Sequence, residues 1–204
     1  MYLESNKILS SHQFGFRQNR STDDQLLLTY NDVTEWFDAG FTVVMLLLDF
    51  SKAFYVIHHG VLLGMLRAIG VFGRLLDKAF LSARLMRVCV GGAVSDSVAV
   101  TSGVPQGSVL GPLLFLVYVN HITKSLQCSY KAFADDYKLY LKTPKHDQFT
   151  ASTLQQDLDE IDAVSTSWNL KLNPEKCVVM FGRSLSDDDT LYPFVLKILT
   201  LVLL

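Results

Sequence analysis

The sequence is poor in cysteine, in excess positive charge and in long hydrophobic segments, and each shortage excludes a class of protein. Its three cysteines, Cys89, Cys128 and Cys177, lie far apart. They provide neither zinc-site spacing nor an even disulfide framework, which is typical of a reducing compartment. With 18 lysines and arginines against 20 acidic residues, the net charge is −2, and this argues against a dedicated nucleic-acid-binding module.

Hydrophobic segments long enough to cross a membrane are also lacking. The longest apolar runs cover residues 41–48, 109–119 and 194–204. All are shorter than the roughly 18–20 residues that a spanning helix needs, and the N-terminus has no apolar stretch of signal-peptide length. We therefore expect no membrane partner, and because no targeting segment is visible the sequence leaves the compartment open.

The composition is that of a folded protein. Half of the 204 residues are apolar and 19% are charged, which is enough to bury a core and excludes disorder by composition. The hydrophobic pattern predicts several helices and strands in mixed order. We expect helices at 22–38, 59–70, 72–86, 108–124 and 150–168, strands at 41–50, 128–134, 137–142 and 177–182, and a hairpin around Gly91 and Gly92. In the most regular helix, 150–168, we place Asp157 and Asp159 off the apolar stripe.

Two aspartates, Asp135 and Asp136, stand side by side in "YKAFADDYKLY". Adjacent like charges repel unless something positive lies near them, so a solvated turn and a divalent metal site both account for the pair. A third acid, Asp49, follows the buried run 41–48. Carboxylates at strand ends can hold two magnesium ions about 3.5–4 Å apart for phosphoryl transfer. The spacing alone does not establish that Asp49 meets the pair.

Five short segments carry the strongest family signal. They are "QFGFRQNRSTDDQLLL" (13–28), "LLLDFSKAF" (46–54), "SGVPQGSVLGPLLFLVYVN" (102–120), "FADD" (133–136) and "WNLKLNPEK" (168–176). In this order they resemble the reverse transcriptase domain of non-LTR (LINE-type) retrotransposons. The Pro-Gln-Gly segment and the Phe-Ala-Asp-Asp box are each highly specific.

The resemblance implies an α+β fold: the palm of a right-hand polymerase, in which a small antiparallel sheet has flanking helices, with partial fingers and no thumb. It implies a reverse transcriptase domain over residues 10–183. On this basis we expect residues 1–9 to be an N-terminal extension and residues 184–204 to be an apolar tail outside the family.

The implied activity is that of an RNA-directed DNA polymerase, which adds deoxynucleotides to a primer 3′-hydroxyl. Its implied cofactor is Mg²⁺, as two ions, with Mn²⁺ as a substitute. Its implied partners are an RNA template, a DNA primer and deoxynucleoside triphosphates. The family works in the nucleus and the cytoplasm, and the resemblance does not specify an oligomeric state.

The resemblance also assigns the chemistry to particular residues. Asp49, Asp135 and Asp136 would be the catalytic carboxylates and metal ligands, and the backbone carbonyl of Phe50 would complete the site. Lys176 would protonate or neutralise the departing pyrophosphate.

Further residues would contact the nucleotide and the template. Phe54 matches the bulky side chain that excludes a ribose 2′-hydroxyl, and Gln106 and Gly107 match the loop that lines the nascent base pair. Gly107 would let the backbone approach the template closely. Arg17 and Arg20 would contact the template or the triphosphate, because guanidinium groups suit phosphate oxygens.

Three positions depart from the family pattern, which leads us to expect aspartate where Tyr55, His58 and His121 stand. Each change needs one base, as in a copy that drifts without selection. Together with the expected lack of a thumb, they support an alternative: a catalytically inactive, truncated retrotransposon relic with no polymerase activity. A cellular reverse transcriptase of another branch is a third interpretation, which fits "GSVLGPLLF" less well.

Overall fold

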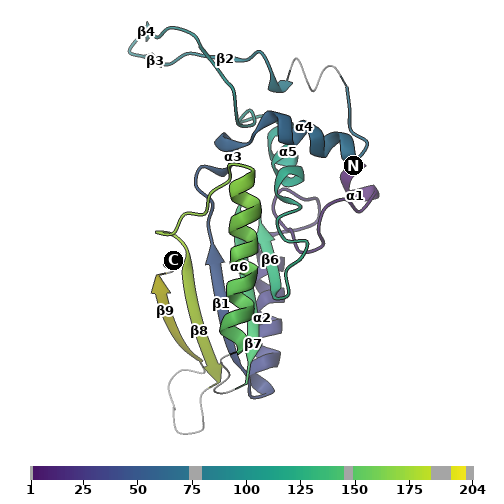
Figure 1. Ribbon diagram of the computed structural model, residues 1–204, viewed down its shortest axis with the longest axis vertical. Helices are drawn as coiled ribbons and strands as arrows, with labels where there is room; N and C mark the ends of the chain where they lie inside the picture. Colours follow the sequence, from purple (N-terminus) through teal and green to yellow (C-terminus); the bar gives the residue numbers. More distant parts are fainter. Residues whose placement is uncertain (1, 74–79, 145–148, 185–193, 201–204) are drawn as a thin grey trace.

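A five-stranded antiparallel sheet is the centre of the molecule (Figure 1). The structure, a computed structural model, describes residues 2–73, 80–144, 149–184 and 194–200. The strand order is β6-β7-β1-β8-β9. The strands are β1 (Thr42–Leu48), β6 (Ser129–Phe133), β7 (Asp136–Thr143), β8 (Val178–Ser184) and β9 (Phe194–Thr200). The α+β class, with a small antiparallel sheet and flanking helices, is confirmed.

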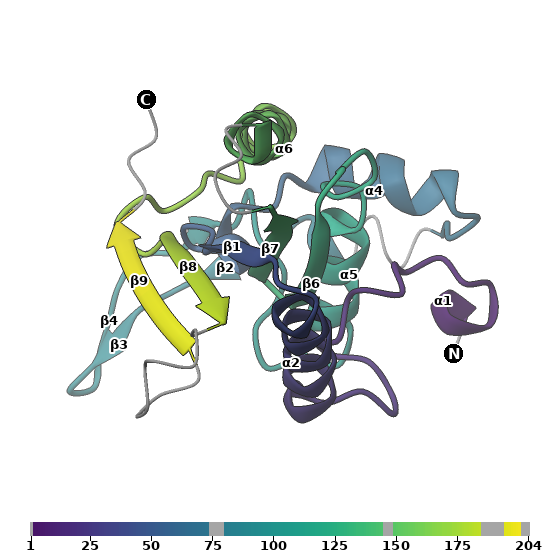
Figure 2. The same cartoon turned by 90° about the horizontal axis from the view of Figure 1, so that it is seen from below.

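Helices cover both faces of this sheet (Figure 2). On one face lies α2 (Thr22–Asp38), and on the other lie α5 (Leu110–Val119) and α6 (Phe149–Ser167), with α4 (His59–Ala68) packed against α5. The side chains of successive residues in β1 point to opposite faces of the sheet, as in any β-strand. Val43 packs with Phe37 and Tyr140 under α2, whereas Val44 and Leu46 enter the main core.

Helix α2 has the bounds that the sequence predicts, for identifiable reasons. Ser21 caps its N-terminus: the Asp24 backbone N–H donates to Ser21 Oγ at 3.0 Å, and the Ser21 N–H donates to Asp24 Oδ2 at 2.8 Å. This reciprocal pair is a capping box. After the helix, Gly40 adopts a φ of +80°, a conformation that glycine reaches without steric cost. The chain then enters β1, whose apolar residues are mostly buried.

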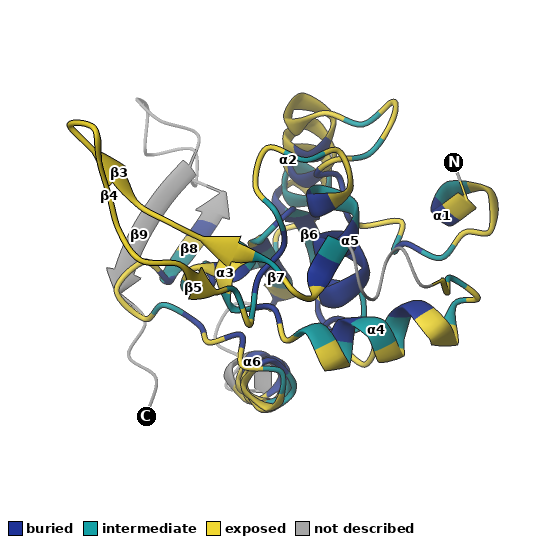
Figure 3. Ribbon diagram, turned by 90° about the horizontal axis from the view of Figure 1, so that it is seen from above, coloured by how far each residue is buried: buried dark blue, intermediate teal, exposed yellow. Residues whose placement is uncertain are grey.

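A long hairpin projects from the body and is exposed along its whole length (Figure 3). Its inner pair is β2 (Leu85–Met86) with β5 (Val98–Ala99), and its outer pair is β3 (Cys89–Val90) with β4 (Ala93–Val94). The turn at Gly91 and Gly92, with φ values of +57° and +86°, confirms the predicted hairpin. The predicted helix 72–86 is wrong at its end, because residues 85–86 pair with a segment more than ten residues away; residues 74–79 lie outside the described part.

The fold includes residues that the sequence analysis assigned to flanking segments. Leu3, in α1 (Tyr2–Ser5), and Leu9 are buried in the main core, although 1–9 was expected to be an extension. Within 184–204, β9 pairs with β8. No helix in the described ranges combines the length and apolar character needed to cross a membrane.

Candidate active site

The pairing of β1 with β7 brings Asp49 and Asp136 together. Leu48 is paired with Tyr137, so the next residues in register are Asp49, just after β1, and Asp136, the first residue of β7. Both side chains line one cavity of about 360 Å³ on the α2 face of the sheet, and Lys176 lines it too. The structure therefore joins acids that are 87 residues apart in the sequence, which the spacing could not show.

Asp135 occupies a different position from its neighbour. Phe133 pairs with Asp136, so the turn of the β6–β7 hairpin consists of Ala134 and Asp135, and the predicted strand 137–142 begins one residue earlier than expected. Ala134 has a φ of +56°, which is uncommon for a residue with a side chain. Asp135 is absent from the lining of the 360 Å³ cavity.

The carboxylate of Asp49 has a buried oxygen whose loss of hydration is poorly compensated by hydrogen bonds. Its Oδ1 accepts no hydrogen bond from any residue that the structure describes, and it is ion-paired with Lys176 Nζ at 3.5 Å. Lys176 is about two-thirds exposed (65%). The backbone of this segment is fixed nearby, because the Asn173 N–H donates to the Asp49 carbonyl at 2.8 Å. A buried carboxylate oxygen without a donor is unusual and costly.

The pKa values of Asp135 and Asp136 are both raised. Burial raises the pKa of Asp136, and the charge of Asp49 raises it further, against the opposing effect of Lys138 and Lys176. Burial likewise raises the pKa of Asp135, and the charges of Asp136 and Asp49 add to the rise. The ionised carboxylates are thus short of positive charge in this arrangement.

A divalent cation fits these residues in donor type and in charge. Carboxylate oxygens are hard ligands, and magnesium is usually bound through one or two carboxylates, with water and phosphate oxygens completing the octahedron. Asp49 and Asp136 share the cavity, and Asp49 Oδ1, which accepts no hydrogen bond from the described residues, is an atom that a cation would satisfy. Across the described residues, no three His, Cys, Asp or Glu side chains gather into a ready-made metal cluster.

The raised pKa values predict a pH-dependent stability. Because the folded state holds the proton of Asp136 to a higher pH than the unfolded state does, the wild-type chain loses stability as pH rises through the interval between the two pKa values. Asp136→Asn removes this loss. Its melting temperature should exceed that of the wild type at pH 7, and the difference should vanish below the ordinary aspartate range. Thermal denaturation at several pH values measures this, and a lower melting temperature at pH 7 would contradict it.

The segment after Asp49 is packed firmly. Phe50 is 2% exposed and lies edge-on to Tyr137, with ring centroids 5.6 Å apart. The ring of Phe54 stacks on Phe115 at 4.1 Å. Both predicted site residues are therefore held in place by aromatic contacts.

The Pro-Gln-Gly loop is fastened to this segment through the backbone. The Val104 N–H donates to the Phe54 carbonyl at 3.0 Å, and the Gly103 N–H donates to the Ile57 carbonyl at 2.9 Å. Gln106 and Gly107, just beyond these bonds, are exposed. The loop thus presents both residues to solvent from a fixed base beside Phe54.

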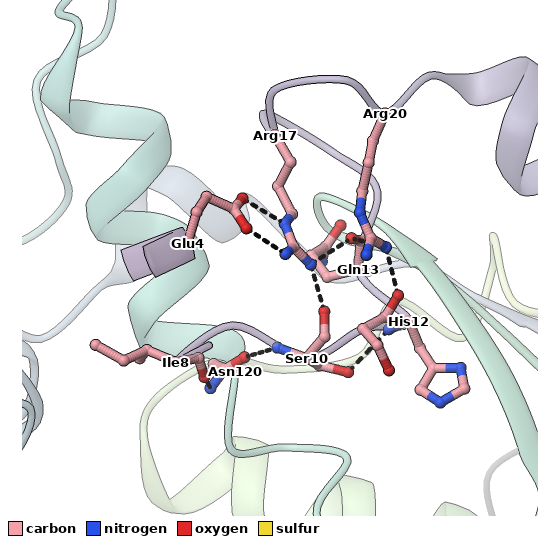
Figure 4. Close-up of polar contacts among 9 residues, drawn as sticks. Glu4, Ile8, Ser10, His12, Gln13, Arg17, Arg20 and Asn120 are labelled. Carbon is pink, nitrogen blue, oxygen red and sulfur yellow. Dashed lines mark hydrogen bonds and ion pairs between the residues drawn. The ribbon is translucent and has the colours of Figure 1, made fainter. Parts of the chain in front are cut away.

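Arg17 and Arg20 lie elsewhere (Figure 4). They line a separate cavity of about 670 Å³ that shares no lining residue with the carboxylate cavity. Arg17 is ion-paired with Glu4, with its Nε 2.7 Å from Oε1, and its side chain is only 7% exposed. Both guanidinium groups also donate to backbone carbonyls of residues 10–13. The structure does not bring these arginines together with the acids.

Two residues of the cavity were missed by the sequence analysis. Lys138 donates from Nζ to Gln25 Oε1 at 2.8 Å, and both side chains line the carboxylate cavity. Lys138 is two residues after Asp136 on β7, so the strand period places both side chains on one face. The sequence could therefore have indicated that Lys138 lies beside Asp136. Gln25, which is 1% exposed, comes from α2, and only the packing of α2 on the sheet reveals it.

The three departures from the family pattern lie outside this cavity's lining. His58 caps α4, where its Nδ1 accepts a hydrogen bond from the Val61 N–H at 3.4 Å. Tyr55 is 60% exposed. His121 has a buried Nδ1 that no described residue contacts by hydrogen bond. None of the three replaces a carboxylate at the candidate site.

Comparison with known proteins gives a consistent result. A family model described as reverse transcriptase (RNA-dependent DNA polymerase) matches residues 1–192, a wider range than the expected 10–183. The chain is 32% identical over 180 residues to an RNA-directed DNA polymerase from the mobile element jockey of Drosophila melanogaster, covering 84% of this chain and 20% of that protein. It is 31% identical over 183 residues to a probable RNA-directed DNA polymerase from transposon BS of the same species, with the same coverage.

The chain thus spans about a fifth of the length of these curated relatives. Among solved structures, it resembles a telomerase from Candida tropicalis in complex with the TWJ fragment of telomeric RNA. The TM-score is 0.65 at 13% identity, over 93% of this chain and 34% of the telomerase. At that identity the likeness concerns the fold alone.

Proposed function

The chain belongs to the reverse transcriptase family, and from this premise we propose that it is the polymerase core of an RNA-directed DNA polymerase of a mobile element. The resemblance to non-LTR retrotransposon enzymes is confirmed by the Drosophila relatives. We further infer that the five-stranded sheet is the palm and that the N-terminal segment with α2 contributes to the fingers. The reaction would add a deoxynucleotide to a primer 3′-hydroxyl.

One observation carries the proposal: Asp49, Asp136 and Lys176 line a single cavity, in which a buried oxygen of Asp49 accepts no hydrogen bond from the part of the chain that the structure describes. Asp49 and Asp136 would hold magnesium, with Asp135 at the adjacent turn as the third acid. A divalent cation bound there would lower the pKa of the attacking hydroxyl and neutralise the triphosphate. This is chemistry by positioning and charge.

The other residues of the site would orient the substrates. Lys176, 3.5 Å from Asp49 Oδ1 and largely exposed, would leave its ion pair and neutralise the pyrophosphate. Phe54, fixed by its stacking on Phe115, would block a ribose 2′-hydroxyl. Gln106 and Gly107 would face the nascent base pair between the RNA template and the DNA primer. Lys138, beside Asp136, would add positive charge to the triphosphate site.

Primer extension tests the proposal directly. The 204-residue chain is given poly(rA) as template, oligo(dT) as primer, dTTP and Mg²⁺, and the products are resolved by length. We expect extension that stops when the metal is chelated and resumes when Mg²⁺ or Mn²⁺ is restored. No extension by a chain that circular dichroism shows to be folded would overturn the proposal and support the inactive relic instead.

A further inference from the structure

Residues 12–15 run alongside β6 and reach the turn that carries Asp135. The Ala132 N–H donates to the His12 carbonyl and the Phe14 N–H donates to the Ala132 carbonyl, both at 2.8 Å. Gln13 and Ala132 thereby form a parallel bridge. The N-terminal "HQFG" segment is therefore an extra partner of the strand that leads into the catalytic hairpin.

The side chain of Gln13 makes a reciprocal contact with the turn itself. Its Nε2 donates to the Ala134 carbonyl at 3.0 Å, and its Oε1 accepts from the Ala134 N–H at 2.9 Å. Oε1 also accepts from the Gly15 N–H at 2.8 Å. Gln13 is 6% exposed, so water does not compete readily for these bonds. One buried amide thus satisfies both backbone polar groups of Ala134.

This contact holds the turn in an uncommon conformation. Ala134 has a φ of +56°, a region that a residue with a Cβ disfavours, so the surrounding structure must maintain it. The peptide groups on both sides of Ala134 set the direction in which the chain enters Asp135 and then Asp136. Fixing those two groups therefore fixes where the carboxylates lie relative to Asp49.

Two further contacts support Gln13. A Cβ added to Gly15 would lie 2.3 Å from the Ala134 nitrogen, so only glycine lets the segment approach the turn this closely. On the other side, Arg17 and Arg20 donate to the Gln13 carbonyl at 3.1 Å and 3.2 Å (Figure 4). The arginines therefore anchor the backbone of Gln13.

We propose that Gln13 is a positioning residue for the catalytic acids: its amide locks the Ala134–Asp135 turn and so sets the spacing of Asp135 and Asp136 against Asp49. Gly15, Arg17 and Arg20 act through Gln13. The role in catalysis rests on the proposed polymerase function, whereas the locking of the turn does not.

Two variants of the full chain test this role. Gln13→Glu keeps the acceptor for the Ala134 and Gly15 N–H groups but sets an oxygen against the Ala134 carbonyl, and Gln13→Met removes all three bonds. Gln127→Glu is the matched control, because Gln127 lies just before the start of β6, away from the turn, and its side chain is exposed. The measurements are hydrogen exchange of the Ala134 amide by NMR, Mn²⁺ affinity by electron paramagnetic resonance, and kcat and KM in primer extension.

In Gln13→Met the Ala134 N–H loses its acceptor, so we expect its hydrogen exchange to be faster by about tenfold or more. In both variants we expect Mn²⁺ affinity to fall about tenfold to a hundredfold, as for other residues that orient metal ligands. In extension, kcat should fall with little change in the KM for primer–template. Gln127→Glu should match the wild type. Gly15→Ala keeps the glutamine at position 13 but pushes residues 12–15 away from the turn, so it should reproduce the Gln13→Met pattern. Gly64→Ala is its control: the added Cβ meets no atom within 4 Å, and the pattern should not appear.

Each of these measurements can contradict part of the proposal. Unchanged Ala134 exchange in folded Gln13→Met and Gly15→Ala would overturn the proposal. Faster exchange with unchanged Mn²⁺ affinity would overturn the role in positioning the acids. If the wild type neither binds Mn²⁺ nor extends a primer, the proposed function fails, and exchange at Ala134 alone then decides whether Gln13 locks the turn.

Discussion

Primer extension by Asp136→Asn should be slower than by the wild type by about a thousandfold or more. Residues that merely orient a metal ligand contribute about tenfold to a hundredfold, so the loss of a ligand itself must cost more. Asp136 is the acid that shares the cavity with Asp49 and Lys176. Asparagine keeps the volume and one oxygen but removes the charge, so this variant separates electrostatics from shape.

The same substitution should stabilise the folded chain at pH 7, for the reason given above, and this makes the test specific. A variant that is more stable and yet inactive cannot have lost activity by unfolding. Asp159→Asn is the matched control, because Asp159 is an exposed acid on α6 and its change should leave the rate unaltered. The double variant Asp135→Ala/Asp136→Ala should show no extension. If Asp136→Asn retained more than about a tenth of the wild-type rate, Asp136 would not be a metal ligand.

Local patterns in the sequence predicted local structure well. The hydrophobic pattern over 22–38 and the glycines at 91 and 92 depend only on nearby residues, so the bounds of α2 and the place of the outer hairpin followed from them. The end of the predicted helix 72–86 failed because β2 depends on pairing with β5. Apolar residues such as Leu85 fit either state until that partner is known.

The candidate site shows the same division between local and distant information. The motif proposed Asp49, Asp135 and Asp136 as the site carboxylates, yet only the strand pairings show that Asp49 and Asp136 are neighbours in register and that Asp135 lies in the turn before β7. Arg17 and Arg20 suit phosphate in isolation, but their partners are Glu4 and the carbonyls of residues 10–13. Which atoms satisfy a charged group is decided by tertiary contacts.

Asp157 is the clearest case of a residue whose role the pattern misjudged, and it yields the second large effect. It lies three residues after Leu154 and four before Ile161, both buried, so it belongs to the apolar stripe of α6 and not to a solvated face. Its side chain is enclosed at 1% exposure. The Cys128 N–H donates to its Oδ2 at 2.8 Å, and the Gln127 N–H lies 3.0 Å from its Oδ1.

Asp157→Ala should lower the free energy of unfolding by about 3–5 kcal/mol, because two backbone N–H groups lose a charged acceptor and each orphaned donor costs about 1–3 kcal/mol. Alanine is the better helix former by roughly half a kcal/mol, so the loss cannot arise from α6 itself. Asp157→Asn keeps one acceptor oxygen and should lose less, and Asp159→Ala should change stability by no more than about 0.5 kcal/mol.

Urea denaturation of the three variants measures these differences. A loss below about 1 kcal/mol for Asp157→Ala would mean that water or a shifted backbone satisfies the two N–H groups. The expected loss would show that Asp157 anchors the start of β6. Asp157 holds the residues before Ser129, and Gln13 holds the turn after Phe133. A strand fixed in this way can present Asp135 and Asp136 at a constant position despite the cost of their mutual repulsion.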